Sequence, residues 1–215
     1  MLDPKMVRAT TIAEARHESK TRFLQAALHV IRAKGYTATT VEDVCEAAGL
    51  TKGSFFHHFD SKEALALAAA DYFTEGAGAL FASAPYHARA GALERLLAYV
   101  DFRKALLTGE LADFTCLAGT MVQEVYDTHP AIRKACNRSI NGHAKTLEPD
   151  IAEAMRKYGV AGEWTAQSLA LYTQAVIQGA FILAKAKGGP AVAAQCLDHL
   201  RRYIEMLFQP RENTA

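Results

Sequence analysis

The sequence has few of the residues that mark secreted, membrane or metal-binding proteins. Its four cysteines in 215 residues are widely spaced and form no C-x-x-C pair, which argues against a disulfide framework and a zinc site. Six prolines and fourteen glycines are too few for a fibrous or low-complexity chain. No apolar run has the length of a membrane span, and no signal segment follows the first residues. We expect a globular cytoplasmic protein without a membrane, metal or cofactor.

Neither sign of charge is in clear excess. The 24 basic and 23 acidic side chains give a net charge of +1, so the chain lacks the broad basic field that general phosphate binding requires. The N-terminal part departs from this average, because residues 1–62 carry nine basic and seven acidic side chains. If the partner is a nucleic acid, a few placed contacts rather than net charge must bind it.

Apolar residues recur at helical spacing along the chain, and no stretch alternates as a strand would. The pattern predicts an all-α protein of about nine helices. Gly142 and Pro149 are expected to bend the seventh helix. The predicted helices span residues 17–34, 40–49, 52–59, 61–82, 93–107, 116–126, 130–158, 163–187 and 190–208.

The second and third predicted helices are short and are joined by a tight turn. Gly49 stands where the backbone must take a positive φ, and Ala47 and Ala48 are small where two helices would cross closely. A helix, a tight turn and a second short helix are typical of a helix-turn-helix. The small core behind the turn is predicted to consist of Val44, Leu50 and Phe55.

One stretch resembles the tetracycline-repressor (TetR) family of bacterial transcriptional regulators: residues 39–65, which read TTVEDVCEAAGLTKGSFFHHFDSKEAL. With the helix before it, the resemblance spans roughly residues 17–70. It implies an N-terminal arm and helix-turn-helix DNA-binding domain over residues 1–62, and a larger helical ligand-binding and dimerisation domain over residues 63–215. A member of this family would be a homodimer that binds a palindromic operator in double-stranded DNA and responds to a small-molecule effector.

By this resemblance the third helix enters the major groove. A hydroxyl at Thr40 and an ammonium at Lys62 suit phosphates, and Lys52 suits a phosphate or a guanine. Phe56 stands where the family usually has tyrosine, which removes a hydrogen bond worth about 1–2 kcal/mol without changing the docking mode. Cys45 stands where the family usually has alanine. The residues implied to contact DNA are Thr40, Thr51, Lys52, Gly53, Ser54, Phe56, His57 and Lys62.

The N-terminal arm leaves two interpretations open, a segment that tracks DNA or a solvated tail. Adjacent residues on a helix do not face one another, so His57 and His58 are not expected to bind a metal.

The larger second part is less specific. Mostly aromatic side chains are predicted to line a cavity between its long helices, with Gln178 or His143 as a polar anchor, although ordinary core packing is the alternative for most of them. These residues are Phe102, Phe114, Cys116, Met121, Tyr126, His143, Trp164, Tyr172, Gln178 and Phe181.

A shorter run, TCLAGTMVQE at residues 115–124, resembles the Cys-Leu-x-Gly segment in one branch of the family. Some members of that branch sense electrophiles through a cysteine there. The start of a helix stabilises a thiolate, which would make Cys116 reactive, whereas a packed small residue is the alternative.

The last two predicted helices offer more apolar surface than one chain needs to cover, so we expect self-association. Two other functions stay open. One is a DNA-binding architectural protein without a ligand, which a tightly filled second domain would favour. The other is a helical-bundle enzyme, although no G-x-S-x-G, phosphate-loop or H-E-x-x-H sequence is present. The predicted dimer interface consists of Ala175, Gly179, Ile182, Leu197, Leu200 and Ile204.

Overall fold

The computed structural model describes residues 4–160 and 162–209, with side chains from residue 16 onward. Within these residues the chain forms helices and no strand, which confirms the all-α prediction. The helices are α1 (Pro4–Lys34), α2 (Val41–Ala48), α3 (Lys52–His58), α4 (Lys62–Ala82), the 3-10 helix η1 (Pro85–Ala88), α5 (Ala92–Ala105), α6 (Leu111–Phe114), α7 (Leu117–Val125), α8 (Pro130–Lys145), α9 (Glu148–Lys157), α10 (Ala166–Lys187) and α11 (Ala191–Leu207).

Helices α1, α6, α8 and α9 differ from the prediction. Helix α1 begins at Pro4, so of the predicted arm only residues 1–3 precede it, and these lie outside the described residues. The segment 130–158 is two helices rather than one bent helix, because Pro149 lies in the first turn of α9, where a missing amide costs no hydrogen bond. Helix α6 has only four residues, too few for periodicity to reveal.

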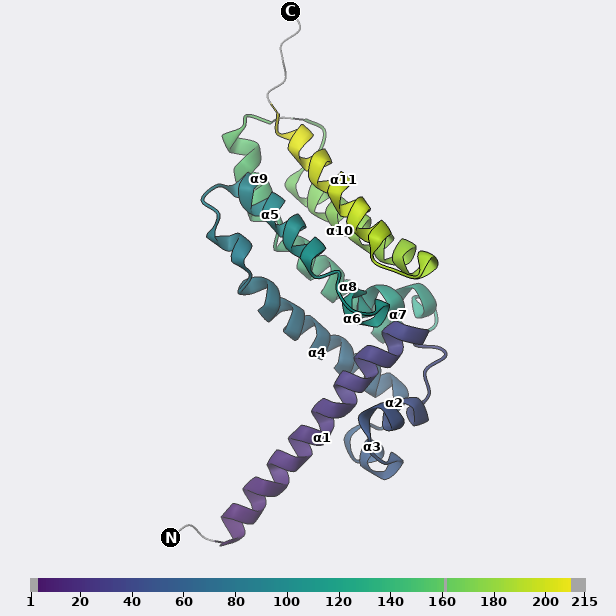
Figure 1. Cartoon of the computed structure of the whole chain (residues 1–215). Coiled ribbons are helices and arrows are strands. Elements are labelled where there is room, and N and C mark those ends of the chain that lie inside the picture. The colour runs from purple at the N-terminus through teal and green to yellow at the C-terminus, as the bar shows by residue number, and fades with distance from the viewer. Residues whose placement is uncertain (1–3, 161, 210–215) are drawn as a thin grey trace, which may run out of the picture.

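Helices α1, α2 and α3 form a small bundle at one end of the molecule (Figure 1). Thr40 caps α2 through a reciprocal capping box with Asp43, and Gly49 ends α2 with a φ of 62°, which confirms the positive φ predicted there. Phe23 of α1 and Phe55 of α3 meet edge to face, with their ring centroids 5.6 Å apart, and both are fully buried. Aromatic packing therefore fixes α3 against α1.

Helix α4 connects this bundle to the other helices, packing on α1 and on α8 (Figure 1). A single apolar core contains Phe55 of α3 and also Met121 of α7 and Ile132 of α8. The predicted division at residues 62 and 63 thus coincides with the start of α4, and the parts on either side share one core. The assignment of a DNA-binding domain to residues 1–62 and of a ligand-binding and dimerisation domain to residues 63–215 stays a prediction.

A second core lies among α5, α8, α9, α10 and α11. It buries Leu197, Leu200 and Ile204 of α11 to 2% exposure or less against helices of the same chain. The prediction that these three residues form a dimer interface is therefore wrong. Helical periodicity shows that a face is buried, but it does not show whether the same chain or a second copy covers it.

The sequence-based expectation that no apolar run has the length of a membrane span is wrong for α10. Its mean hydropathy reaches 1.3 over an 18-residue window, and by length and composition alone it could cross a membrane. In the structure it packs against α8, α9 and α11, and Leu169, Ile177 and Ala180 are buried. This packing is that of a core helix.

Candidate nucleic-acid interface and ligand cavity

Helix α3 presents one side to solvent at the end of the bundle. Its first turn is capped by Thr51, whose hydroxyl accepts a hydrogen bond from the Ser54 amide at 3.2 Å. Phe56 is 57% exposed although the preceding Phe55 is fully buried. The structure therefore brings the residues predicted for α3 onto one solvent-facing segment, with Ser54 half-buried and the others exposed: Thr51, Lys52, Gly53, Ser54, Phe56 and His57.

Two contacts from α1 hold α2 and α3 in place, one on each helix, and sequence reasoning missed both. The Arg22 guanidinium donates to the carbonyl oxygen of Ala48 at 2.6 Å, at the end of α2. The imidazole of His58 hydrogen-bonds the Ser19 hydroxyl at 2.7 Å, and burial lowers the pKa of His58. Their partners lie more than 25 residues away along the chain, so local sequence patterns do not reveal them.

Lys52 forms an exposed ion pair with Glu42 of α2. The hydrogen bond from Lys52 lowers the pKa of Glu42, which keeps the carboxylate charged. Exposed ion pairs contribute little to stability, so Lys52 can exchange this carboxylate for a phosphate at small cost.

Lys62 and Thr40 have partners within the chain. The Lys62 ammonium donates to the carbonyl oxygens of Tyr36, Thr37 and Thr39 at 3.1, 3.3 and 2.9 Å. The Thr40 hydroxyl donates to the Asp43 carboxylate at 2.6 Å. The assignment of both side chains to phosphates stays a prediction, and each would have to exchange these partners on DNA. In this structure they fix the turn between α1 and α2.

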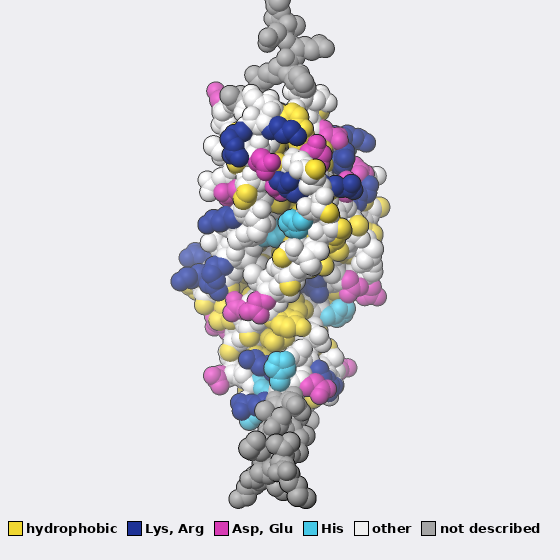
Figure 2. Space-filling view, turned by 90° about the vertical axis from the view of Figure 1, so that its left-hand side faces the viewer, with side chains coloured by type: hydrophobic (Ala, Val, Ile, Leu, Met, Phe, Trp, Pro, Cys, Tyr) yellow, Lys and Arg dark blue, Asp and Glu magenta, His cyan; other side chains and the backbone are white. Residues whose placement is uncertain are grey.

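The surface charge agrees with the near-zero net charge. Figure 2 shows basic and acidic side chains interspersed over the face it presents, without an extended basic field. Binding of DNA by this surface must therefore depend on a few placed groups and on helix termini.

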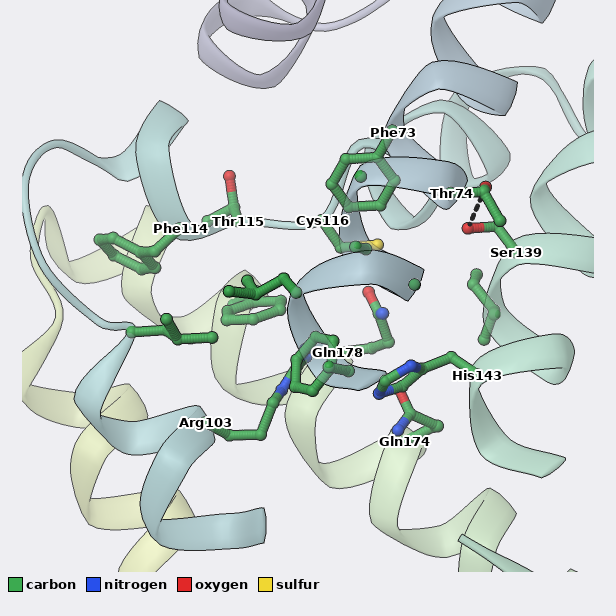
Figure 3. A pocket seen from close by; sticks show the side chains of 18 of the residues that line it. Phe73, Thr74, Arg103, Phe114, Thr115, Cys116, Ser139, His143, Gln174 and Gln178 are labelled. Carbon is green, nitrogen blue, oxygen red and sulfur yellow. Dashed lines mark hydrogen bonds between the residues drawn. The ribbon is translucent and has the colours of Figure 1, made fainter. Parts of the chain in front are cut away.

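A cavity of about 590 Å³ lies next to α4, α8 and α10 (Figure 3), within the range of small-molecule sites. Helices α5 and α6 and the segment before α7 complete its wall, and Arg32 of α1 also reaches it. Five of the predicted cavity residues line it: Phe114, Cys116, His143, Gln178 and Phe181.

The other predicted residues do not line the cavity. Met121 is fully buried in the core shared with the bundle, and Phe102 packs edge to face on Phe81, behind the wall. Trp164 lies against Phe208. Tyr172 and Tyr126 are 45% and 59% exposed. The cavity assignment of these residues is wrong because aromatic composition predicts apolar packing without telling a cavity wall from a core or an exposed face.

A polar network crosses the floor of the cavity. Gln174 donates to the Tyr99 hydroxyl at 3.1 Å, and this hydroxyl lies 2.9 Å from His143 Nε2. Burial, with the neighbouring Arg103 cation, lowers the pKa of His143 to about 4. His143 is therefore neutral near pH 7. Tyr99 is fully buried and its oxygen accepts from Gln174, so we assign its hydroxyl proton to His143 Nε2, which places the imidazole proton on Nδ1. Sequence reasoning found His143 but missed Tyr99, Gln174 and Arg103.

Two sets of contacts connect the bundle and the turn after α1 to α6 and α7, which adjoin the cavity, although Glu124 itself does not line it. The Arg32 guanidinium donates to the Asp113 carbonyl oxygen at 3.0 Å and also reaches Thr115. The Glu124 carboxylate of α7 accepts hydrogen bonds from the Tyr36 and Thr37 amides at 3.2 and 2.8 Å. A change at the cavity wall can therefore reach the turn that precedes α2.

Cys116 lies at the start of α7 and faces the cavity (Figure 3). Its sulfur accepts a hydrogen bond from the Gly119 amide at 3.3 Å, so the thiol caps the helix. The side chain is half-buried. Cys116 thus combines the predicted place at a helix start with access to the cavity.

An apolar surface remains on the outer side of α10 and α11. Of the predicted interface residues, Ala175 and Ile182 are exposed and Gly179 is half-buried. Surface of this kind is normally covered by another molecule. Large exposed side chains share these two helices: Leu171, Tyr172, Ile182, Leu183, Tyr203 and Met206.

Comparisons with known proteins cover both parts of the chain. Residues 23–69 match the model for bacterial regulatory proteins of the tetR family, and residues 92–200 match that for the tetracyclin repressor-like C-terminal domain. The HTH-type transcriptional repressor DhaR of Mycobacterium sp. (strain GP1) is 25% identical over 80% of this chain and 84% of its own length. The uncharacterized regulator YerO of Bacillus subtilis (strain 168) is 39% identical over 57 residues, 26% of this chain. The matches span only 20–32% of the lengths of the first curated relatives.

Solved structures share the fold. A TetR-family regulator from Agrobacterium tumefaciens superposes with a TM-score of 0.77 at 19% identity, over 87% of this chain and 98% of its own. The regulator CifR, solved with 26-base-pair operator DNA, gives a TM-score of 0.70 at 18% identity, over 85% of this chain and 95% of its own. At these identities the likeness concerns the fold.

Proposed function

Because the chain belongs to the TetR family of bacterial transcriptional regulators, we propose that it is a homodimeric cytoplasmic repressor that a small molecule releases from a palindromic operator. The observation that carries this proposal is the exposed α3 on a bundle that shares one core with α7 and α8 and reaches the cavity through Arg32 of α1. The apolar surface of α10 and α11 supports dimerisation. Two α3 helices in a dimer would read two half-sites on one side of DNA.

Release would depend on α1, which belongs to the bundle and reaches the cavity, and on α4, which packs on the bundle and lines the cavity. Arg32 belongs to α1, and α4 contributes Phe73 and Phe81 to the wall while its first residue, Lys62, holds the turn before α2. A ligand that separates α4 from α8 would therefore shift the bundle and change the spacing of the two α3 helices. Reversing an occupancy near 99% requires a ligand that prefers the released state by about 10⁴-fold in total.

We expect Lys52→Ala to weaken operator binding about tenfold at low salt and Glu42→Gln to strengthen it. Loss of Lys52 removes a phosphate or guanine contact, whereas loss of the Glu42 charge removes a carboxylate that competes with DNA for the same ammonium. The measurement is an electrophoretic mobility or anisotropy titration on DNA upstream of the gene, repeated over a salt series. The slope of the logarithm of the DNA-binding constant against the logarithm of the salt concentration should be smaller in magnitude by about one for Lys52→Ala.

The control for this series is Lys157→Ala, which removes an exposed lysine from α9, far from the bundle (Figure 1). It should bind DNA as the unchanged protein does. Unaltered binding by Lys52→Ala would contradict the docking of α3, and failure of the protein to bind any DNA would contradict the proposed function itself.

A second candidate for the effector is an electrophile that reacts with Cys116, which faces the cavity at a helix start. The thiolate would add to the β-carbon of an α,β-unsaturated aldehyde, forming a C–S bond while a proton from water goes to the α-carbon. Such an aldehyde should release DNA from the unchanged protein and not from Cys116→Ser. Cys196→Ser, which removes another half-buried thiol, is the matched control. Equal release from both variants would eliminate the thiol mechanism.

Two alternatives receive less support. A filled second domain would favour a regulator without a ligand. The second part of this chain instead contains a cavity of about 590 Å³. A helical-bundle enzyme is disfavoured because the family and the named relatives are transcriptional regulators.

A further inference from the structure

We propose that the cavity binds an aromatic monocarboxylate, with the carboxylate on Arg103 and the aryl group among the phenylalanines of the wall. The inference rests on the proposed ligand-responsive function and names the class of effector. It depends on three features of the lining: one cation without a partner among the described residues, a second hydrogen-bond donor next to it, and aromatic walls.

The charged residues of the lining are Arg32, Arg103, Arg138 and Asp113, three cations and one anion. Arg32 is held by backbone carbonyls, and Arg138 lies 3.5 Å from the carboxylate of Asp71 outside the cavity. Arg103, alone of the three cations, has neither a carboxylate nor another acceptor within bonding distance among the described residues. The cavity therefore offers one guanidinium to a ligand.

Arg103 is positioned by two aromatic rings. Its guanidinium carbon lies 5.1 Å from the Phe81 centroid and 5.7 Å from the Phe181 centroid, and the side chain extends toward the cavity in Figure 3. These cation–π contacts orient the group without using its N–H donors. A planar guanidinium with free donors matches a carboxylate in a bidentate arrangement.

His143 supplies the second donor. Because Tyr99 donates to its Nε2, the proton of the neutral imidazole lies on Nδ1, and no acceptor for that proton is found among the described residues. Every fully buried side-chain nitrogen or oxygen in the described part of the chain has a partner. The unpaired donors of His143 and Arg103 are thus accessible from the cavity, and both suit an anion.

The remaining wall favours an aryl group over a second charge. Phe73, Phe114 and Phe181 line the cavity, and Gly76 and Gly78 of α4 leave part of it without side chains. Aromatic rings prefer offset or edge-to-face contact with other rings. Since Arg103 is the one lining cation without a partner among the described residues, it balances a single negative charge, and a monocarboxylate fits better than a phosphate ester, which carries more charge.

The test compares three probes with one naphthalene body and different charges. 2-Naphthoate is the anion, 2-naphthamide its neutral isostere, and (2-naphthylmethyl)trimethylammonium the cation, each titrated calorimetrically into the full-length protein without DNA. We expect 2-naphthoate to bind about ten- to hundredfold more tightly than the amide, as a charge-assisted contact predicts, and the cation to bind least. Arg103→Met should reduce the affinity for 2-naphthoate to that for the amide and leave amide binding unchanged.

The matched control is Arg156→Met, which removes an exposed arginine of α9 that does not line the cavity and should change no affinity more than about twofold. Circular dichroism checks the fold of each variant, and Arg103→Gln replaces Arg103→Met if the latter fails to fold. Equal affinity for anion and amide, tighter binding of the cation, no effect of either Arg103 variant, or no binding of any probe at 1 mM would each overturn the proposal. DNA binding and release by another compound would in that case leave the proposed function standing. Carboxylate binding by a protein that does not bind DNA would contradict only the proposed function.

Discussion

Replacing Phe55 by alanine is expected to lower the free energy of unfolding by about 3–5 kcal/mol and to abolish DNA binding. Phe55 is fully buried, and its ring centroid lies 5.6 Å from that of Phe23 in α1 and 5.5 Å from that of Phe59. Alanine would leave a cavity at the point where α3 is fixed to α1. Because the same core extends to α7 and α8, the loss should appear in the unfolding of the whole chain. Urea denaturation followed by circular dichroism measures it.

The adjacent residue provides the control. Phe56 is 57% exposed, so Phe56→Ala should change the free energy of unfolding by less than about 1 kcal/mol while still weakening operator binding. The pair separates stability from DNA contact at neighbouring positions of one helix. Similar losses of stability in both variants would contradict the orientation of α3.

Replacing Ile182 by aspartate is expected to convert the proposed dimer to a monomer and to reduce operator affinity by at least about a thousandfold. Ile182 is 48% exposed on the apolar surface of α10 and α11, so the free monomer can carry a carboxylate there without loss of its own packing. In a dimer the same carboxylate would be buried without a partner. A monomer offers one α3 to one half-site, which removes the benefit of binding two half-sites together. Analytical ultracentrifugation and a DNA titration measure the two effects.

The control for this variant is Tyr126→Asp, which places the same charge at a residue that is 59% exposed on another surface. It should remain dimeric and bind DNA. A dimeric Ile182→Asp variant, or an unchanged protein that is monomeric at micromolar concentration, would remove the α10 and α11 surface from consideration as the interface.

The helix-turn-helix could be predicted from sequence because its determinants are local. A cap at Thr40, a positive φ at Gly49 and apolar residues three and four positions apart are readable within one short window, and each is present in the structure. The contacts that hold α2 and α3 on α1 could not be predicted in this way. Arg22 and His58 act on partners that only the folded chain brings close.

The cavity could be predicted only in part. Cys116 and Gln178 were recognisable as polar or reactive side chains in an apolar setting, and both line it. Arg103 was not recognisable as a cavity residue, because a lysine or arginine on a helix is normally solvated. The position of Arg103 over Phe81 and Phe181 depends on the packing of three helices. The dimer-interface prediction for Leu197, Leu200 and Ile204 of α11 was wrong for a different reason. A periodic row of apolar residues has the same sequence pattern whether its own chain or a second copy covers it.

The core that joins the bundle to α7 and α8 also limits how this protein can be recombined with its relatives. A chimaera cut at residue 62 would pair a foreign α3 with Met121 and Ile132, residues that complete the same core from the other side. Such a hybrid would inherit mismatched packing and would lose the contacts of Arg32 and Glu124 across the junction. Exchanging operator specificity alone should instead succeed by grafting only the solvent-facing positions of α3, which leave that core untouched.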